Sequence, residues 1–238
     1  MKRTFYFELC YILGLSLLAV ANAFMSWGDY GMGVVVAPAY LLHLKLSQIW
    51  PFFSFGMAEY LTQALVLLLM ILILRKFKIT FLFSFGTAIL YGLILDGAMK
   101  VTTLLPTEET VLALGLPEMG FAAVRLVVYL LADVVATFGI ALLFKTYITQ
   151  EAYDLIVKEL ALKYRWDLGK VKTTYDCISF VVAIVLSFAF FGFGQFEGIK
   201  IGSVVTTFVN GTLIGLWTKL LDKKFEFKDG LPLRKYFE

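Results

Sequence analysis

Long runs of apolar residues make up most of this chain, and its polar residues gather in the stretches between them. Six runs are about 20 residues long, the length that an α-helix needs to cross the hydrocarbon core of a bilayer. They cover residues 7–27, 56–74, 79–99, 121–144, 174–194 and 201–219. The pattern predicts an all-α polytopic membrane protein with six transmembrane helices.

Two further apolar stretches are too short or too charged to cross a bilayer comfortably. Residues 34–50 are interrupted by Pro38 and carry His43 and Lys45, whereas residues 151–166 set leucine and isoleucine among charged residues. Both patterns indicate short interfacial or re-entrant helices. Such helices are tolerated at depth only where protein or water covers their polar backbone.

The two short stretches superimpose when the chain is shifted by 113 residues. Tyr40 then falls on Tyr153, and in the spans that follow Gln63 falls on Asp176. Because three spans is an odd number, the second copy must enter the membrane upside down. We therefore expect two inverted three-helix repeats, a plan that recurs in secondary transporters. The expected divisions are a first repeat (1–104), an outer loop (105–120), a second repeat (121–222) and a cytoplasmic tail (223–238).

The positions of lysine and arginine predict the orientation. With a cytoplasmic N-terminus, the 21 cations all fall on the inner side except Lys45, Lys100, Arg125 and Lys200. Inner loops of membrane proteins carry such an excess of positive charge. Both ends of the chain are therefore expected in the cytoplasm.

Composition excludes several classes of function. Hydrophobic residues make up 60% of the chain and charged ones only 16%, far from the values of a soluble domain. A net charge of +3, with lysines at the ends of spans, gives no indication of nucleic-acid binding. Cys10, Cys177 and His43 form no metal or disulfide framework, so neither a metal nor a cofactor is expected. No hydrolase, protease or nucleotide-binding motif is present, which argues against an enzyme.

Polar residues inside the spans are the candidate functional residues, because each must face protein or water rather than lipid. Arg125 and Asp133 lie on one face of the fourth span, either as a cation or proton site or as a structural ion pair. The candidate substrate-binding residues are Gln63, Arg125, Asp133, Asp176 and Asn210. Glu59 and Asp96, near the outer ends of their spans, are candidates for gating or for ordinary capping.

The last span contains two pairs of glycines at small-xxx-small spacing. They are Gly198 with Gly202 and Gly211 with Gly215. This spacing lets helices approach closely, so we expect the span to pack against a neighbour from the same chain or from a second copy in a homodimer. A polar stripe from residue 203 to residue 210 is expected to face the protein interior.

Residues 152–176, "AYDLIVKELALKYRWDLGKVKTTYD", and residues 198–222 carry a recognisable pattern. An aromatic-Asp pair, Tyr153-Asp154, precedes a glycine and then Asp176 in the following span. This order resembles that of the YczE/YitT-like family of bacterial integral membrane proteins, although Glu151 stands where proline is usual. The resemblance implies a multi-pass protein of the bacterial cytoplasmic (inner) membrane, loosely transporter-like, without settling an activity.

The leading hypothesis is a small-solute permease or secondary transporter with a polar site between the two inverted repeats. Its expected partners are the lipid bilayer and a small solute. The alternative is a substrate-binding or accessory membrane subunit that acts with partner proteins and transports nothing by itself. A third reading is a scaffold for a membrane-associated enzyme, acting through the basic segment 158–172.

Overall fold

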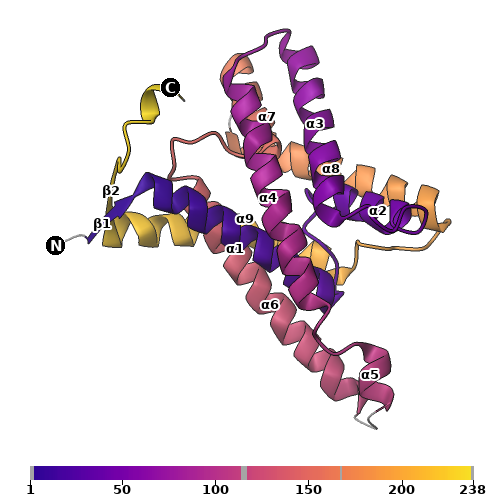
Figure 1. The fold of residues 1–238 in the computed structure, drawn as a ribbon. Helices are drawn as coiled ribbons and strands as arrows, with labels where there is room; N and C mark the ends of the chain where they lie inside the picture. The colour runs from indigo at the N-terminus through magenta and orange to yellow at the C-terminus, as the bar shows by residue number, and fades with distance from the viewer. Residues whose placement is uncertain (1–2, 114–116, 167, 237–238) are drawn as a thin grey trace.

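The computed structural model describes residues 3–113, 117–166 and 168–236 and is almost entirely helical (Figure 1). The first half contains β1 (Arg3–Tyr6), α1 (Phe7–Gly28), α2 (Ala37–Leu46), α3 (Phe55–Leu74), α4 (Thr80–Thr102) and α5 (Glu108–Ala113). The second half contains α6 (Glu118–Leu143), α7 (Ala152–Tyr164), α8 (Leu168–Phe191), α9 (Ile201–Lys224), β2 (Phe225–Lys228) and the 3-10 turn η1 (Arg234–Tyr236).

Six of the described helices are long and apolar enough to cross a membrane: α1, α3, α4, α6, α8 and α9. They coincide with the six predicted spans, so the prediction of an all-α, six-span integral membrane protein is confirmed. The largest boundary changes concern α8, which begins at Leu168 rather than at residue 174, and α9, which continues to Lys224 rather than ending at residue 219. The second of these extensions is supported by contacts at the end of α9. Its last turns are held in place because Lys145 pairs with Asp222 at 2.7 Å and Leu221 is buried.

The two halves of the chain have the same order of helices: long, short, long, long. The short helices α2 and α7 lie within the predicted stretches 34–50 and 151–166. The helix α7 lies beside the C-terminal half of α3. Its first amide N–H, from Ala152, donates to Gln63 Oε1 at 3.2 Å, and Lys163 near its end donates to the carbonyl of Leu74 at 2.9 Å. The N-terminus of α7 therefore lies level with the middle of a transmembrane helix.

The helices α1 and α6 run antiparallel through the centre of the molecule (Figure 1). The carbonyl of Gly28 at the end of α1 accepts from Arg125 near the start of α6 at 3.1 Å. The two helices cross at Gly14 and Gly139, where a Cβ atom added to either glycine would lie 2.8 Å from the carbonyl oxygen of the other. Only glycine permits this approach, because a side chain would force the two backbones apart.

The remaining helices pack around this central pair in a reciprocal way. The helix α1 contacts α4, and α6 contacts α9; α2 contacts both α3 and α8, and α7 contacts both α8 and α3. Two pairings have no counterpart over the described residues. The helix α3 packs closely against α4, whereas α8 and α9 have almost no contact, and α4 contacts α7, whereas α9 and α2 have almost none.

The two ends of the chain meet in a short parallel sheet. Strand β1 pairs with β2 from Arg3 opposite Phe225 to Tyr6 opposite Lys228. Glu8, at the start of α1, accepts hydrogen bonds from the amides of Gly230 and Leu231 at 2.9 and 3.0 Å. The expected cytoplasmic tail of residues 223–238 thus begins inside α9 and continues as a strand.

Candidate functional site

Two glutamates lie buried in the middle of the protein, joined through one glutamine. Glu59 and Gln63 on α3 are fully inaccessible, and Glu151 and Tyr153 at the start of α7 are only 6% and 4% exposed. We call these four residues the diacid cluster. It contains two of the residues singled out in the sequence, Glu59 and Gln63.

The amide of Gln63 holds the diacid cluster together. Its Oε1 accepts from the backbone N–H of Ala152 at 3.2 Å, which turns its Nε2 toward the carboxyl groups. Nε2 then donates to Oε2 of Glu59 at 3.2 Å and to Oε2 of Glu151 at 3.3 Å. The hydroxyl of Tyr153 donates to the same oxygen of Glu59 at 2.9 Å. Both donors of one amide are therefore used on two acidic side chains.

The helix α4 fixes the position of the loop that carries Glu151. Ser84 donates to the carbonyl of Gln150 at 2.7 Å, and Thr87 donates to that of Thr149 at 2.9 Å. These bonds hold the loop at the depth of the α4 interior, so its backbone oxygens are satisfied away from water. Glu151, the next residue, consequently lies buried against α3.

The start of α3 is fixed by Asp96 of α4. The carboxylate accepts from the backbone N–H of Gly56 at 2.7 Å and from the hydroxyl of Ser54 at 2.6 Å. Ser54 in turn accepts from the amide of Met57 at 3.1 Å as the N-cap of α3. Asp96 therefore caps the helix that carries Glu59.

Among the described residues, no lysine, arginine or histidine forms an ion pair with Glu59 or Glu151, and Oε1 of each glutamate has no hydrogen-bond partner. Burial, followed by the negative charge of Glu59, raises the pKa of Glu151 well above its ordinary value. The arrangement can hold a proton on one of two buried acids that share a single amide donor.

The other predicted substrate-binding residues lie elsewhere in the molecule. The amide of Asn210 on α9 donates to Asp133 on α6 at 3.0 Å. Asp133 also lines a pocket of about 250 Å³ between α6 and α9, together with Tyr129 and Thr206. Asp133 and Asn210 are thus brought together, as a pair separate from the diacid cluster.

Arg125 does not reach Asp133, although both lie along α6. Its guanidinium pairs with Asp29 at 3.1 Å and with Glu108 at 3.5 Å, at the end of the molecule near α5. A long side chain near a helix end extends toward the polar boundary, where other charges are available. The ion pair with Asp133 that the sequence left open is therefore not formed.

Asp176 is also separate from Gln63, its counterpart in the sequence alignment. It pairs with Lys172 one turn earlier on α8 at 3.1 Å, and Lys172 also reaches Asp154 on α7 at 3.5 Å. The five predicted residues therefore occupy four places rather than one site.

The four glycines of the last span differ in their surroundings. A Cβ atom on Gly202 would collide with the carbonyl of Tyr30 and with the ring of Tyr129, so this glycine makes a close contact within the chain. Gly198 precedes α9 and adopts a positive φ of 67°, a turn conformation that suits glycine. At Gly211 and Gly215 no atom of the described residues lies within 4 Å of an added Cβ, so packing against those residues does not explain these two glycines.

Comparison with known proteins gives a family but no chemistry. Residues 5–219, which include the first five spans and most of α9, match the model of DUF6198, a family of unknown function. The chain belongs to the DUF6198 family. No curated protein and no solved structure matches it. The chemistry of this DUF6198 protein must therefore be argued from its own residues.

The candidate functional residues predicted from the sequence do not include Glu151 and Tyr153 of the diacid cluster in the DUF6198 chain. In the resemblance to YczE/YitT-like proteins, Glu151 is a departure from the usual proline. When the chain is shifted by 113 residues, Glu151 falls on Pro38 of the first half. An acidic residue in place of a proline at the start of a short helix is the sequence signal that could have identified Glu151.

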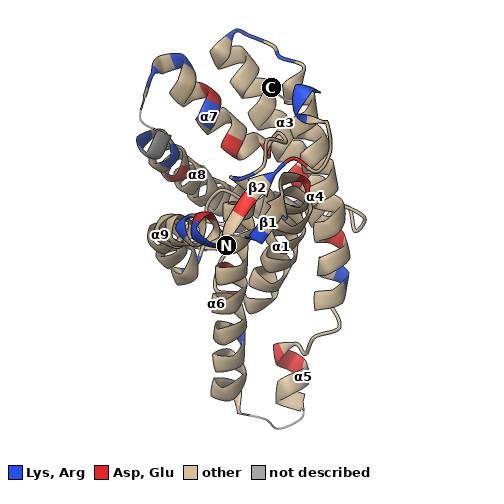
Figure 2. Ribbon diagram, turned by 90° about the vertical axis from the view of Figure 1, so that its left-hand side faces the viewer, with Lys and Arg blue, Asp and Glu red and all other residues tan. Residues whose placement is uncertain are grey.

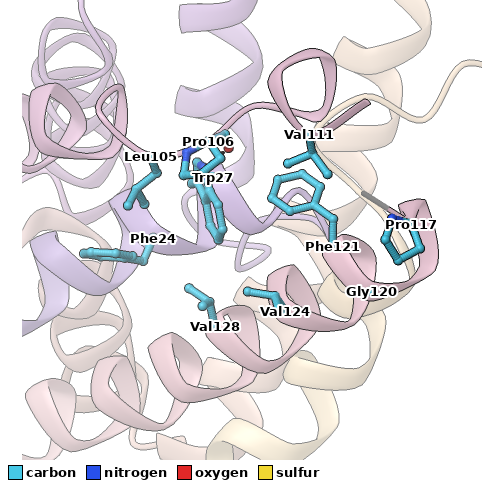
Figure 3. A pocket seen from close by; sticks show the side chains of 10 residues that line it. All are labelled: Phe24, Trp27, Leu105, Pro106, Val111, Pro117, Gly120, Phe121, Val124 and Val128. Atoms are coloured by element: carbon cyan, nitrogen blue, oxygen red, sulfur yellow. Dashed lines mark hydrogen bonds between the residues drawn. The ribbon is translucent and has the colours of Figure 1, made fainter. Parts of the chain in front are cut away.

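A second, larger pocket of the DUF6198 protein has a different character (Figure 3). It has a volume of about 540 Å³ and lies between α1, α6 and the segment around α5, with Phe24, Trp27, Phe121 and Val128 in its wall. Trp27 donates its indole N–H to the carbonyl of Pro106 at 3.2 Å. None of the described residues that line it is charged or belongs to the diacid cluster, so this pocket suits apolar chains such as those of lipids.

Proposed function

We propose that this protein is a small-solute permease or secondary transporter that works by alternating access between two inverted repeats, α1 to α4 and α6 to α9. The helix pairing carries the proposal. When the halves are exchanged, the contacts α1–α4, α2–α3 and α2–α8 become α6–α9, α7–α8 and α7–α3, all of which are present. A two-fold axis in the membrane plane produces such reciprocal pairing, and inverted repeats of this kind recur in secondary transporters.

The two short helices support the same relationship through their lysines. Lys45 of α2 donates to the carbonyl of Phe190 at the end of α8, at 2.9 Å. Lys163 of α7 donates to the carbonyl of Leu74 at the end of α3, also at 2.9 Å. In each case a cation on a short helix binds the C-terminus of a long helix in the other half, where the helix dipole favours positive charge.

The larger of the two pairings without a counterpart, α3 with α4, suggests the conformational change. The helix α3 is locked to α4 because Gly56 and Gly92 let the backbones meet, whereas α8 and α9 have almost no contact over their described residues. In a transporter with inverted repeats, exchanging the conformations of the repeats produces the other state. We therefore expect a second state in which α8 packs on α9 and α3 separates from α4.

The pocket beside Asp133 is our candidate for the solute site. Its volume of about 250 Å³ suits a small molecule, and Asp133 is the charged residue in its wall. A carboxylate at this depth favours a cationic or zwitterionic solute, which would neutralise it. Asn210 orients the carboxylate from the opposite helix.

We also propose the bacterial cytoplasmic membrane, with both ends of the chain inside, as its location. Figure 2 shows lysine and arginine gathered at the α3–α4 connection, around the start of α8 and beside the N-terminus, while the small helix α5 at the far end is acidic. This distribution supports the end that carries the lysines and arginines as the cytoplasmic face. The similarity to YczE/YitT-like proteins stays a prediction.

The test is uptake by the purified protein in liposomes, measured against a panel of radiolabelled amino acids, polyamines, nucleosides and sugars. In parallel, spin labels on exposed residues would report distances across the two helix pairs in a Cys177→Ser background, using Leu65 with Leu90 and Val182 with Val205. We expect the α8–α9 distance to shorten as the α3–α4 distance lengthens. A single unchanging conformation with no uptake of any solute would refute the proposal.

The second candidate is an accessory subunit without transport of its own. The outward face of α9 favours it, because among the described residues nothing lies within 4 Å of a Cβ atom added at Gly211 or Gly215. A helix of another protein could occupy this face. Stable co-purification with an ATPase, together with failure of the isolated protein to transport, would favour this reading.

A further inference from the structure

The diacid cluster carries more negative charge than its surroundings can neutralise. Oε2 of Glu59 and Oε2 of Glu151 lie on either side of a single nitrogen, Nε2 of Gln63, at 3.2 and 3.3 Å. Both side chains are more than nine-tenths buried, and a second oxygen on each has no partner. An isolated buried carboxylate costs several kcal/mol even after relaxation, and two like charges at this separation add their repulsion.

The groups that face the diacid cluster from the neighbouring helices cannot supply the missing positive charge. They are Tyr11 of α1, Tyr91 of α4, Asp154 of α7 and Tyr175 of α8. Three are neutral phenols and one is a further acid. Lys172 of α8 is already engaged by Asp154 and Asp176. The positive end of the α7 dipole, about half an elementary charge, offsets part of one carboxylate but not two.

A bound proton neutralises the excess negative charge of the two carboxylates better than a metal ion would. Among the described residues, no group of three or more histidine, cysteine, aspartate or glutamate side chains is placed to hold a metal. A proton needs only one of the two acids, and the protonated acid gains a donor of its own. Two buried carboxyl groups that share one proton are a recurring solution to like charge at short distance.

The hydrogen bonds differ between the two acids, and this difference indicates where the proton resides. Within the described part of the chain, Glu59 accepts from both Gln63 and Tyr153, whereas Glu151 accepts from Gln63 alone. Donors to a carboxylate favour its ionised form. Glu59 is therefore the better anion, and Glu151, whose pKa is raised by burial, is the one that holds the proton more tightly.

We propose that Glu59 and Glu151 form a proton-binding site that holds one shared proton, chiefly on Glu151, and that this site couples the transport cycle to a proton gradient. The coupling rests on the transport function proposed above, whereas the shared proton does not. Glu59 comes from the first repeat and Glu151 from the second, so movement of α3 relative to α7 would change the distance between the two acids. The proton would then be released or bound as the repeats move.

The decisive measurement is infrared difference spectroscopy of the purified full chain in lipid nanodiscs, titrated from pH 5 to pH 10. A buried carboxylic acid has a C=O stretching band that its ionised form lacks. We expect the wild type to retain this band at pH 7 and to lose it at alkaline pH. Glu151→Gln should weaken the band at pH 7 and shift its loss to lower pH, because it removes the acid that holds most of the shared proton.

Two further variants make the assignment specific. Glu59→Gln should keep the band but shift its loss to lower pH, because Glu151 no longer faces a negative charge. Tyr153→Phe should shift the loss to higher pH, because the anion of Glu59 has one donor fewer. Glu109→Gln, which changes an exposed acid on α5, serves as the matched control and should leave the band unchanged.

Each outcome decides a separate claim. Absence of the band from the wild type at pH 7, a band that Glu151→Gln leaves intact, or a band that sodium ions remove at constant pH would overturn the shared proton. Uptake in liposomes that ignores an imposed pH gradient would overturn the coupling while leaving transport standing. A titrating band together with no uptake of any solute would support the proton site and count against the transport function instead.

Discussion

The side chain of Gln63 can be tested by replacing it with methionine, which has a similar length and no amide. Gln63→Met removes three buried hydrogen bonds, those to Ala152, Glu59 and Glu151. A buried polar group that loses its partner costs about 1–3 kcal/mol. Because the similar volume leaves little cavity and Tyr153 still serves Glu59, we expect a total loss of about 2–5 kcal/mol in the free energy of unfolding.

The assay is equilibrium unfolding in mixed micelles with increasing sodium dodecyl sulfate, followed by circular dichroism at pH 7. Thr62→Val is the matched control, one residue away on α3, because Thr62 donates only to the carbonyl of Ala58 in its own helix, at 2.8 Å. That bond lies within one turn, so its loss should cost less than about 1 kcal/mol. Equal stability of the two variants would refute the view that Gln63 joins α3 to α7.

Three further predictions concern the crossing of α1 and α6, the pH dependence and the solute pocket. Gly14→Ala should destabilise the protein by about 1–3 kcal/mol, because the new Cβ would lie 2.8 Å from the Gly139 carbonyl oxygen. The control Gly86→Ala, where no described atom lies within 4 Å of the new Cβ, should be neutral or stabilising in the same micelle titration. Burial raises the pKa of Glu151. The contribution of its protonated form to the free energy of unfolding is therefore present at low pH and is lost as pH rises from about 4.3, the ordinary value, through the raised pKa. Thermal melts should show the wild type losing stability relative to Glu151→Gln over that range. Asp133→Asn keeps an acceptor for Asn210 and should preserve the melting temperature while abolishing uptake in liposomes, and unchanged uptake would remove Asp133 from the solute site.

The hydrophobic pattern predicted the number and type of the spans because a bilayer imposes its own rules. A helix that crosses it must be about 20 residues long and largely apolar, and both properties can be read along the chain without knowing any contact. The short helices α2 and α7 were recognisable for the complementary reason, since they were apolar but too short or too charged to cross.

Contacts between distant residues could not be read in the same way. Glu59 and Glu151 meet because α7 begins level with the middle of α3, and this depends on how α4 holds the preceding loop. Similarly, β1 and β2 form only because the two ends of the chain arrive at the same place. No local pattern encodes either event.

The glycine pairs and the charged face of α6 show where sequence alone is ambiguous. Gly202 and Gly211 belong to the same spacing pattern, yet Gly202 contacts Tyr129 and Gly211 faces open space, because α9 touches α6 over only part of its length. Arg125 and Asp133 share a helix face but bind Asp29 and Asn210, respectively. The sequence by itself determined which segments enter the membrane, because solvent sets that choice; the tertiary structure decided which polar groups meet, because each partner lies on another helix.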